Sequence, residues 1–197
     1  MITRADFDII TQWVPSGARV LDLGCGDGAL LKHLAESKAV KGYGIENDDA
    51  ALLGAIDNGV NVIQANLEDG LRDIASQSFD VVVLSQTLQA IRHTEAVVAE
   101  MLRVGTQAIV TFPNFGYWKH RLQIAFGGRM PVSDDLPYEW YNTPNVHLFT
   151  VRDFEAFCNA RNYRVMNRRV LAGDRETAWL PNLTGNLAIY QICPSQR

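Results

Sequence analysis

The sequence predicts one α/β domain that is doubly wound around a mostly parallel sheet. Short apolar runs alternate with segments of helical periodicity, as in consecutive βαβ units. Two of the runs, residues 81–84 and 108–110, are apolar on both faces, which is typical of strands covered by helices on both sides. With 197 residues, of which 47% are hydrophobic, the chain can bury one sizeable core but not two.

The first half of the chain contains the regular alternation. Residues 6–14 form the first expected helix, because Phe7, Ile10 and Trp13 recur at helical spacing before Pro15 and Gly17 end it. Five β-rich runs follow, at residues 19–23, 40–45, 61–65, 79–84 and 106–112. Four helices are expected between them, at residues 28–37, 48–58, 70–76 and 94–104.

The regular alternation of strands and helices ends after residue 112. Residues 112–149 hold nine of the eighteen aromatic residues, and glycines and prolines interrupt any long element there, so we expect a cap inserted at about residues 113–149. A helix at 151–161 and strands at 164–171 and 187–192 complete the chain. The last two strands can pair as an antiparallel edge, which brings the expected sheet to seven strands.

One helix is expected inside the cap. Its apolar residues recur at helical spacing with basic residues between them; they are Phe115, Trp118, Leu122 and Ala125 or Phe126. The simplest interpretation is that this stripe packs on the domain. The alternatives are that it covers a ligand or docks a partner.

Composition narrows the classes of function. The net charge of −4 gives no global attraction for nucleic acid or anionic membranes. Three cysteines are an odd number without zinc-ligand spacing, and no metal site is expected. Because residues 1–8 lack an apolar leader and no run approaches the ~20 apolar residues of a span, we expect a soluble, cytoplasmic protein.

A glycine-rich turn after the first strand is the strongest motif. Residues 20–28 read Val-Leu-Asp-Leu-Gly-Cys-Gly-Asp-Gly, a strand running into a turn and then a helix. Gly24, Gly26 and Ala29 also fit the looser dinucleotide pattern, with Glu46 at the expected distance. Charge favours a different ligand, because Asp22 and Asp27 would repel a pyrophosphate and attract the ammonium and sulfonium of S-adenosylmethionine.

This motif resembles that of the class I S-adenosylmethionine-dependent methyltransferases, with their Rossmann-like fold. The resemblance implies an acid at the first strand end, an acceptor for the ribose hydroxyls at Glu46, an adenine contact at Asn66, and ligand contacts after the fourth strand. The implied cofactor is S-adenosylmethionine, with S-adenosylhomocysteine as product or bound form. The expected binding residues are Asp22, Gly24, Cys25, Gly26, Gly28, Glu46, Asn47, Asn66, Leu67, Ser85 and Gln86.

No catalytic residue can be assigned from the sequence. Methyl transfer needs an aligned acceptor and, for a protonated acceptor, a base. The chain lacks the Asn/Asp-Pro-Pro-Tyr/Phe box of enzymes that methylate amino groups of bases and amides. A lone histidine such as His93 is more often structural than catalytic, and no histidine is tied in sequence to Cys25, which we interpret as a small buried residue.

Several later segments are more specific than the glycine turn. They read Leu-Ser-Gln-Thr-Leu-Gln at 84–89, Phe-Pro-Asn-Phe-Gly-Tyr-Trp at 112–118 and Leu-Pro-Tyr-Glu-Trp-Tyr-Asn-Thr-Pro-Asn at 136–145. With the first motif they resemble the MetW family of methionine biosynthesis proteins over nearly the whole chain. The resemblance implies a bacterial cytosolic protein that acts with homoserine O-acyltransferase.

Three functions therefore remain. The first is an accessory subunit that binds S-adenosylmethionine and reports methionine status to the acyltransferase. The second is an active methyltransferase on a small-molecule acceptor, with Gln86, His93 or Tyr117 orienting that acceptor. The third, a nicotinamide-dependent dehydrogenase, is disfavoured by the acids beside the glycine turn.

Overall fold

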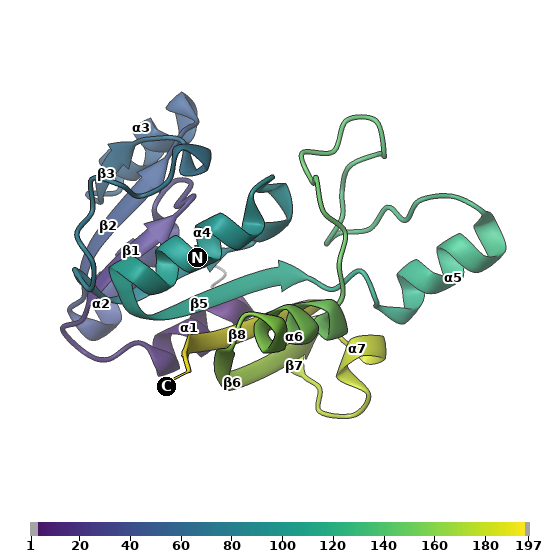
Figure 1. The fold of residues 1–197 in the computed structure, drawn as a ribbon. Helices are drawn as coiled ribbons and strands as arrows, with labels where there is room; N and C mark the ends of the chain where they lie inside the picture. Colours follow the sequence, from purple (N-terminus) through teal and green to yellow (C-terminus); the bar gives the residue numbers. More distant parts are fainter. Residues whose placement is uncertain (1–3, 196–197) are drawn as a thin grey trace.

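The computed structural model describes residues 4–195 and contains one twisted sheet with helices on both faces (Figure 1). The strand order is β3-β2-β1-β4-β5-β8-β6-β7. The strands are β1 (Arg19–Leu23), β2 (Lys41–Glu46), β3 (Asn61–Gln64), β4 (Phe79–Ser85), β5 (Gly105–Pro113), β6 (Tyr163–Ala172), β7 (Arg175–Glu176) and β8 (Leu187–Pro194). All seven predicted strands are confirmed, and the two-residue β7 is an addition.

The strands β1 to β5 are parallel, as the sequence predicts. Parallel strands end at a common edge, and the register places the polar residues of that edge together. Asp22 on β1 lies beside Gly44 on β2 and Val83 on β4, and Ser85 lies beside Thr111 on β5. The carboxyl edge of the sheet is thus the place where α/β folds of this kind bind ligands.

The last strands make the antiparallel edge. β8 pairs antiparallel with β5 on one side and with β6 on the other, so the chain returns from the outer β6 to fill an inner position. The predicted antiparallel pairing of these two strands is confirmed. β7 pairs with the end of β6 at the outer edge.

The helices match the predicted positions with one exception. They are α1 (Ala5–Trp13), α2 (Ala29–Lys38), α3 (Asp49–Asp57), α4 (Thr94–Val104), α5 (Trp118–Gly127), α6 (Val151–Ala160) and the short α7 (Pro181–Thr184), with 3-10 turns η1 (Leu67–Asp69) and η2 (Leu88–Ala90). None of the helices in residues 4–195 combines the length and apolar character needed to span a bilayer.

The prediction of a helix at residues 70–76 is wrong. Gly70 takes a positive φ of 79°, and irregular turns follow it. The guanidinium of Arg103 donates to the carbonyls of Leu71 and Ile74 at 2.8 and 2.9 Å, so a long-range side chain occupies the acceptors that a helix would use. That tertiary contact overrides a weak local preference.

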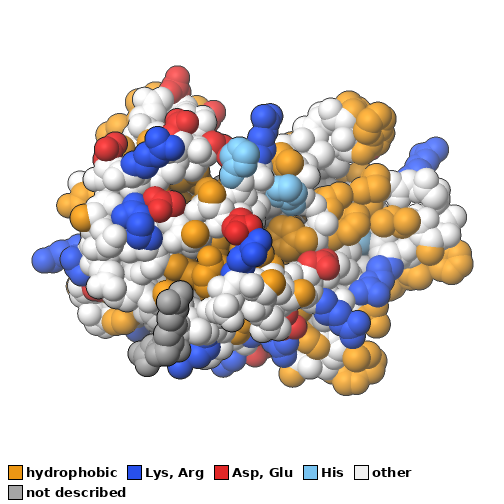
Figure 2. Space-filling model, in the orientation of Figure 1, with side chains coloured by type: hydrophobic (Ala, Val, Ile, Leu, Met, Phe, Trp, Pro, Cys, Tyr) orange, Lys and Arg blue, Asp and Glu red, His pale blue; other side chains and the backbone are white. Residues whose placement is uncertain are grey.

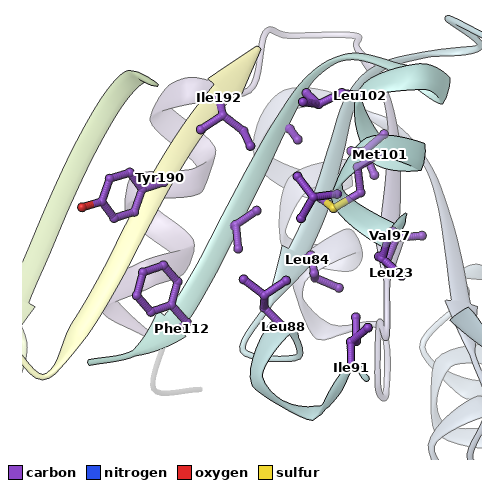
Figure 3. Packing of buried hydrophobic residues seen from close by; sticks show 14 of the residues in the cluster. Leu23, Leu84, Leu88, Ile91, Val97, Met101, Leu102, Phe112, Tyr190 and Ile192 are labelled. Atoms are coloured by element: carbon purple, nitrogen blue, oxygen red, sulfur yellow. The ribbon is translucent and has the colours of Figure 1, made fainter. Parts of the chain in front are cut away.

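The core lies in two layers because strand residues alternate between faces. Val81 and Val83 pack with α1 and α2, whereas Val82 and Leu84 pack with α4 and α6. Figure 3 shows the second layer, in which Met101 of α4 lies over the sheet. Helices on both faces hold the carboxyl edges of β1 and β4 in place.

The segment between β5 and α6 differs from the rest. α5 projects beyond the carboxyl end of β5, and a long irregular segment returns from it to α6 (Figure 1). We call residues 115–142 the arm. Figure 2 shows hydrophobic side chains gathered over this projecting part. The interpretation that the apolar stripe packs on the domain is wrong, because Trp118, Leu122 and Phe126 are all exposed.

Candidate functional site

The turn between β1 and α2 is shaped by three glycines. Gly24, Gly26 and Gly28 have positive φ angles of 68°, 56° and 74°, a region that costs other L-residues energy. A Cβ on Gly26 would meet nothing within 4 Å, so this glycine leaves open space for a ligand. A Cβ on Gly28 would lie 2.7 Å from Val60, so Gly28 instead permits close packing.

Asp22 lies beneath this turn with one oxygen unpaired. Its side chain is 2% exposed, and its Oδ1 has no hydrogen-bond partner in the part of the chain that the structure describes. Burial raises the pKa of Asp22 to about 7, the nearby Arg4 opposes this rise, and Glu46 adds to it. A buried acceptor without a partner is costly, so Asp22 is poised to gain stability from a cationic donor.

Glu46 ties the glycine turn to the end of β2. Its carboxylate accepts N–H bonds from Gly26 at 2.8 Å, Asn47 at 2.8 Å and Asp48 at 2.9 Å. A carboxylate offers about four acceptor positions, so one remains for the ribose contact that the sequence predicts. The structure adds a role that the sequence analysis missed, because Glu46 also holds the loop that surrounds Asp22.

Replacing Glu46 with alanine should therefore affect both the ligand and the loop. Three backbone N–H groups lose a charged acceptor, and we expect nucleoside binding to weaken by about 1–3 kcal/mol. Calorimetric titration of Glu46→Ala measures this. Glu36→Ala, an exposed acid on α2, is the matched control and should bind normally. Equal affinity in both variants would contradict the assignment of Glu46.

The adenine contacts predicted at β3 lie at the same edge of the sheet. Asn66 follows β3, and its Oδ1 accepts from the N–H of Glu68 at 3.0 Å, which caps η1. Leu67 packs partly buried against the core beside it. An amide oxygen can accept two hydrogen bonds, so one acceptor position of Asn66 Oδ1 remains for the adenine amino group that the sequence analysis predicts.

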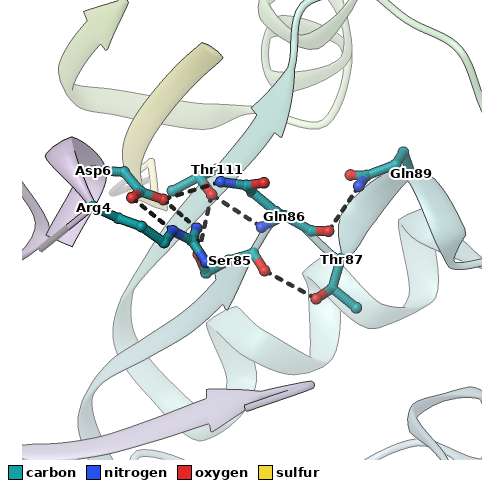
Figure 4. Close-up of polar contacts among 7 residues, drawn as sticks. All are labelled: Arg4, Asp6, Ser85, Gln86, Thr87, Gln89 and Thr111. Atoms are coloured by element: carbon teal, nitrogen blue, oxygen red, sulfur yellow. Dashed lines mark hydrogen bonds and ion pairs between the residues drawn. The ribbon is translucent and has the colours of Figure 1, made fainter. Parts of the chain in front are cut away.

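The end of β4 is held by a polar network that Figure 4 draws. Arg4 makes a two-bond ion pair with the buried Asp6, at 3.0 and 2.5 Å, and reaches Ser85 Oγ at 3.3 Å. Gln86 donates from its side chain to Asp6 at 3.3 Å, and its N–H donates to Thr111 Oγ1 at 2.9 Å. Gln86 also takes a positive φ of 52°. Such strain is typical of functional turns.

A hollow of about 380 Å³ gathers part of the predicted set. It is lined by five predicted residues, Asp22, Gly24, Cys25, Gly26 and Ser85. Gly28, Glu46, Asn47, Asn66, Leu67 and Gln86 do not line it and lie around the same sheet edge.

The remaining lining residues include Asp27 and Ala29 of the glycine motif and four residues that the sequence analysis missed. Those four are Arg4, Phe7, Leu30 and His33, contributed by the start of α1 and by α2. The guanidinium of Arg4 lies 4.7 Å from the ring centroid of Phe7 and near Asp22. No local signal connects residue 4 with residue 85, because only the docking of α1 brings them together. The hollow therefore contains a carboxylate and a guanidinium, which suits a ligand that carries both an ammonium and a carboxylate.

His93 and Tyr117, which the sequence analysis suggested for orienting an acceptor, do not line this hollow. His93 is 73% exposed and lines a larger open groove of about 900 Å³ between α4 and α6, which none of the eleven predicted residues lines. Tyr117 packs against Trp118 and His120 in the arm. Burial raises the pKa of Cys25 to about 12, so its thiol stays protonated, which agrees with rejecting it as a nucleophile.

Sequence comparison decides the family. A model of the family described as methionine biosynthesis protein MetW matches residues 4–192. The chain belongs to the MetW family. A bifunctional methionine biosynthesis protein MetXA/MetW from Rhodopirellula baltica is 36% identical over 159 residues, which cover 76% of this chain and 26% of that protein. The chain thus matches about a quarter of the length of this relative.

Structural comparison agrees on the fold. An S-adenosylmethionine-dependent methyltransferase from Mesorhizobium loti has a TM-score of 0.71 at 15% identity and covers 95% of this chain and 97% of its own. Another from Archaeoglobus fulgidus has a TM-score of 0.69 at 11% identity, with 95% and 91% covered. The predicted class I methyltransferase fold is confirmed. At such low identity, this likeness concerns the fold alone.

Proposed function

We propose that this chain binds S-adenosylmethionine at the carboxyl edge of β1, β2 and β4 and serves as an accessory subunit of homoserine O-acyltransferase. The observation that supports this ligand is the buried Oδ1 of Asp22, which has no hydrogen-bond partner within residues 4–195 and lies under an open glycine turn. We also propose that residues 1–197 act as one ligand-binding domain, with residues 113–149 as its insertion.

The residues present fit the amino-acid end of this ligand. Asp22 would accept from the ammonium, and Arg4 would donate to the carboxylate, since both line one hollow. The open face of Gly26 leaves room beside them. Glu46 and Asn66, at the ends of the neighbouring strands, would hold the ribose and the adenine amino group. S-adenosylmethionine supplies a sulfonium methyl group when bound; S-adenosylhomocysteine would use the same contacts.

Partnership is supported by the fused relative. In the Rhodopirellula baltica protein, one chain carries both the MetXA and the MetW names, and this chain matches only a quarter of it. Fusion keeps two modules at a high effective concentration, which is useful when they act together. A separate chain would achieve the same by binding the acyltransferase.

Regulation requires that the ligand bind the free and the partner-bound chain with different affinities. We expect saturating S-adenosylmethionine to change the dissociation constant between this chain and homoserine O-acyltransferase by about fivefold or more. Titrating the two proteins with and without ligand measures this, and acyltransferase rates are recorded in parallel. An unchanged constant and unchanged rates would contradict a regulatory role. A titration with NAD, which should not bind, tests the dehydrogenase alternative.

Methyl transfer is the second candidate, favoured by the fold of the structural neighbours. Gln86, strained at the end of β4, is the residue placed to orient an acceptor. His93 is poorly placed as a base, because it lies outside the hollow. Formation of S-adenosylhomocysteine with a defined acceptor would establish this activity, and its absence leaves the accessory role as the better account.

A further inference from the structure

α5 presents an apolar stripe to solvent. Trp118, Leu122 and Phe126 are spaced by four residues, so they lie on one face of the helix. Their exposed fractions are 42%, 44% and 85%. A helix that packs alone on its own domain buries this face, so α5 has the pattern of a helix that buries its stripe against another molecule.

The arm holds this stripe in a defined position. His120, on the opposite face of α5, is fully buried, and its Nε2 lies 3.0 Å from Ser133 Oγ. Gln123 exchanges two hydrogen bonds with the backbone of Val132, at 3.3 and 3.1 Å. Residues 132 and 133 of the returning segment therefore hold α5 by the face opposite to the apolar stripe. A preorganised surface loses little entropy on binding.

The exposed apolar surface is concentrated on the arm. Nine of the nineteen large apolar side chains that are exposed in residues 4–195 belong to residues 118–141. A hollow of about 770 Å³ beside the end of α5 is lined by Met130, Trp140 and Arg129, among others. A projecting aromatic stripe next to a hollow has the make-up of the central anchors of protein interfaces.

The charges beside the apolar stripe indicate which kind of partner it fits. Residues 115–133, which include α5, contain Lys119, Arg121 and Arg129 and no acid, whereas the returning residues 134–142 carry Asp134, Asp135 and Glu139. All three cations are exposed. In a two-fold dimer that packs α5 against α5, the basic residues beside the two stripes would meet, which costs energy. The complement of the stripe is an apolar groove with an acidic rim on a different protein.

We infer that the arm is the surface through which this chain docks on homoserine O-acyltransferase, with Trp118, Leu122 and Phe126 seated in an apolar groove that has an acidic rim. The inference rests on the proposed partnership and goes beyond it by naming the surface. The ligand hollow is separate, because no residue of the arm lines it. Docking through the arm leaves the edge that binds the nucleoside accessible.

The test uses the whole chain of 197 residues and the purified acyltransferase of the same organism. Leu122→Glu/Phe126→Glu places charge on the exposed stripe without entering the core. We expect it to weaken binding to the acyltransferase by about thirtyfold or more, which corresponds to the loss of about 2 kcal/mol, the size expected for one central anchor. The control is Leu53→Glu/Ile56→Glu on α3, whose side chains are 61% and 53% exposed, and it should bind within about twofold of wild type.

Each outcome decides the question. S-adenosylmethionine affinity should be unchanged in the arm variant, which shows that the nucleoside site is intact. If wild type binds the acyltransferase and the arm variant binds equally well, the docking surface is wrong and the partnership stands. If wild type does not bind at all, both are wrong. Two other results would also overturn the inference. In these, the wild type binds phosphatidylglycerol vesicles, or associates with itself, and the arm variant loses that binding while it still binds the acyltransferase. The arm would then be the surface for a membrane or for a second copy of the chain.

Discussion

Asp22→Asn should weaken S-adenosylmethionine binding by about 10- to 100-fold at pH 8. The substitution keeps the shape of the side chain and removes the charge that would face the ligand ammonium, and a charge-assisted hydrogen bond contributes about 1.5–3 kcal/mol. Asp22 is 2% exposed, and its Oδ1 has no partner in the described part of the chain, so water cannot replace the lost interaction well. Calorimetry with S-adenosylmethionine and S-adenosylhomocysteine measures both affinities.

The control is Asp57→Asn at the end of α3. Asp57 is exposed and does not line the hollow that contains Asp22. We expect this variant to bind nearly as wild type. Asp22→Asn should also be at least as thermally stable as wild type at pH 8, because it removes a buried charge. Wild-type affinity in Asp22→Asn would remove Asp22 from the site.

Binding should depend on pH through the same carboxyl. Burial raises the pKa of Asp22 to about 7 in the free protein, whereas an ammonium ligand favours the ionised form. Below pH 7, binding must therefore release the Asp22 proton, and affinity should be about tenfold lower at pH 6 than at pH 8. Asp22→Asn should show a flat profile. In the free protein, the stabilising contribution of Asp22 is complete below its ordinary pKa of 3.8 and is lost as pH rises through about 7.

Asn114→Ala should lower the free energy of unfolding by about 3–5 kcal/mol, a large part of the 5–15 kcal/mol typical of a domain. Asn114 is fully buried where β5 ends. Its Nδ2 donates to the carbonyls of Asn182 and Gly185, at 3.2 and 2.7 Å. Its Oδ1 accepts from the N–H groups of Gly116 and Val151, at 3.0 and 3.2 Å. Alanine leaves all four backbone groups without this partner.

Urea unfolding of Asn114→Ala and of the control Asn61→Ala measures this effect. Asn61 is exposed and makes one long hydrogen bond, 3.5 Å to the carbonyl of Gly42, so its loss should cost less than about 0.5 kcal/mol. The midpoint should fall for Asn114→Ala with an unchanged slope, as expected for lost stability without a change in the exposed surface. A midpoint equal to that of the control would show that the four hydrogen bonds of Asn114 do not stabilise the fold as expected.

The parallel half of the sheet could be predicted because its signals are local. Each strand from residue 19 to residue 113 is a β-rich run, and each is followed by a turn that breaks the pattern. The glycine turn could be predicted for the same reason, since positive φ angles at three positions require glycine there. The structure also explains the wrong helix at 70–76, where the deciding contact comes from Arg103, about thirty residues away.

The composition of the candidate site was only partly predictable. Asp22 and the glycines were found because they lie within one short motif, residues 22–28. Arg4 was not, because its place beside Ser85 depends on the docking of α1 on the sheet. The loop-holding role of Glu46 was also hidden, since it depends on three backbone N–H groups whose direction follows from the fold.

The sequence by itself determined the alternation of strands and helices, the acid-flanked glycine turn and the kinship with the MetW family, because each depends on residues close together or on whole segments. Only the tertiary structure decided that Oδ1 of Asp22 is buried without a partner among the residues described, and that the stripe on α5 faces outward. Burial is a property of what surrounds a side chain, and the surroundings of both come from distant parts of the chain. An apolar stripe has the same spacing whether it is covered by its own domain or left for another protein.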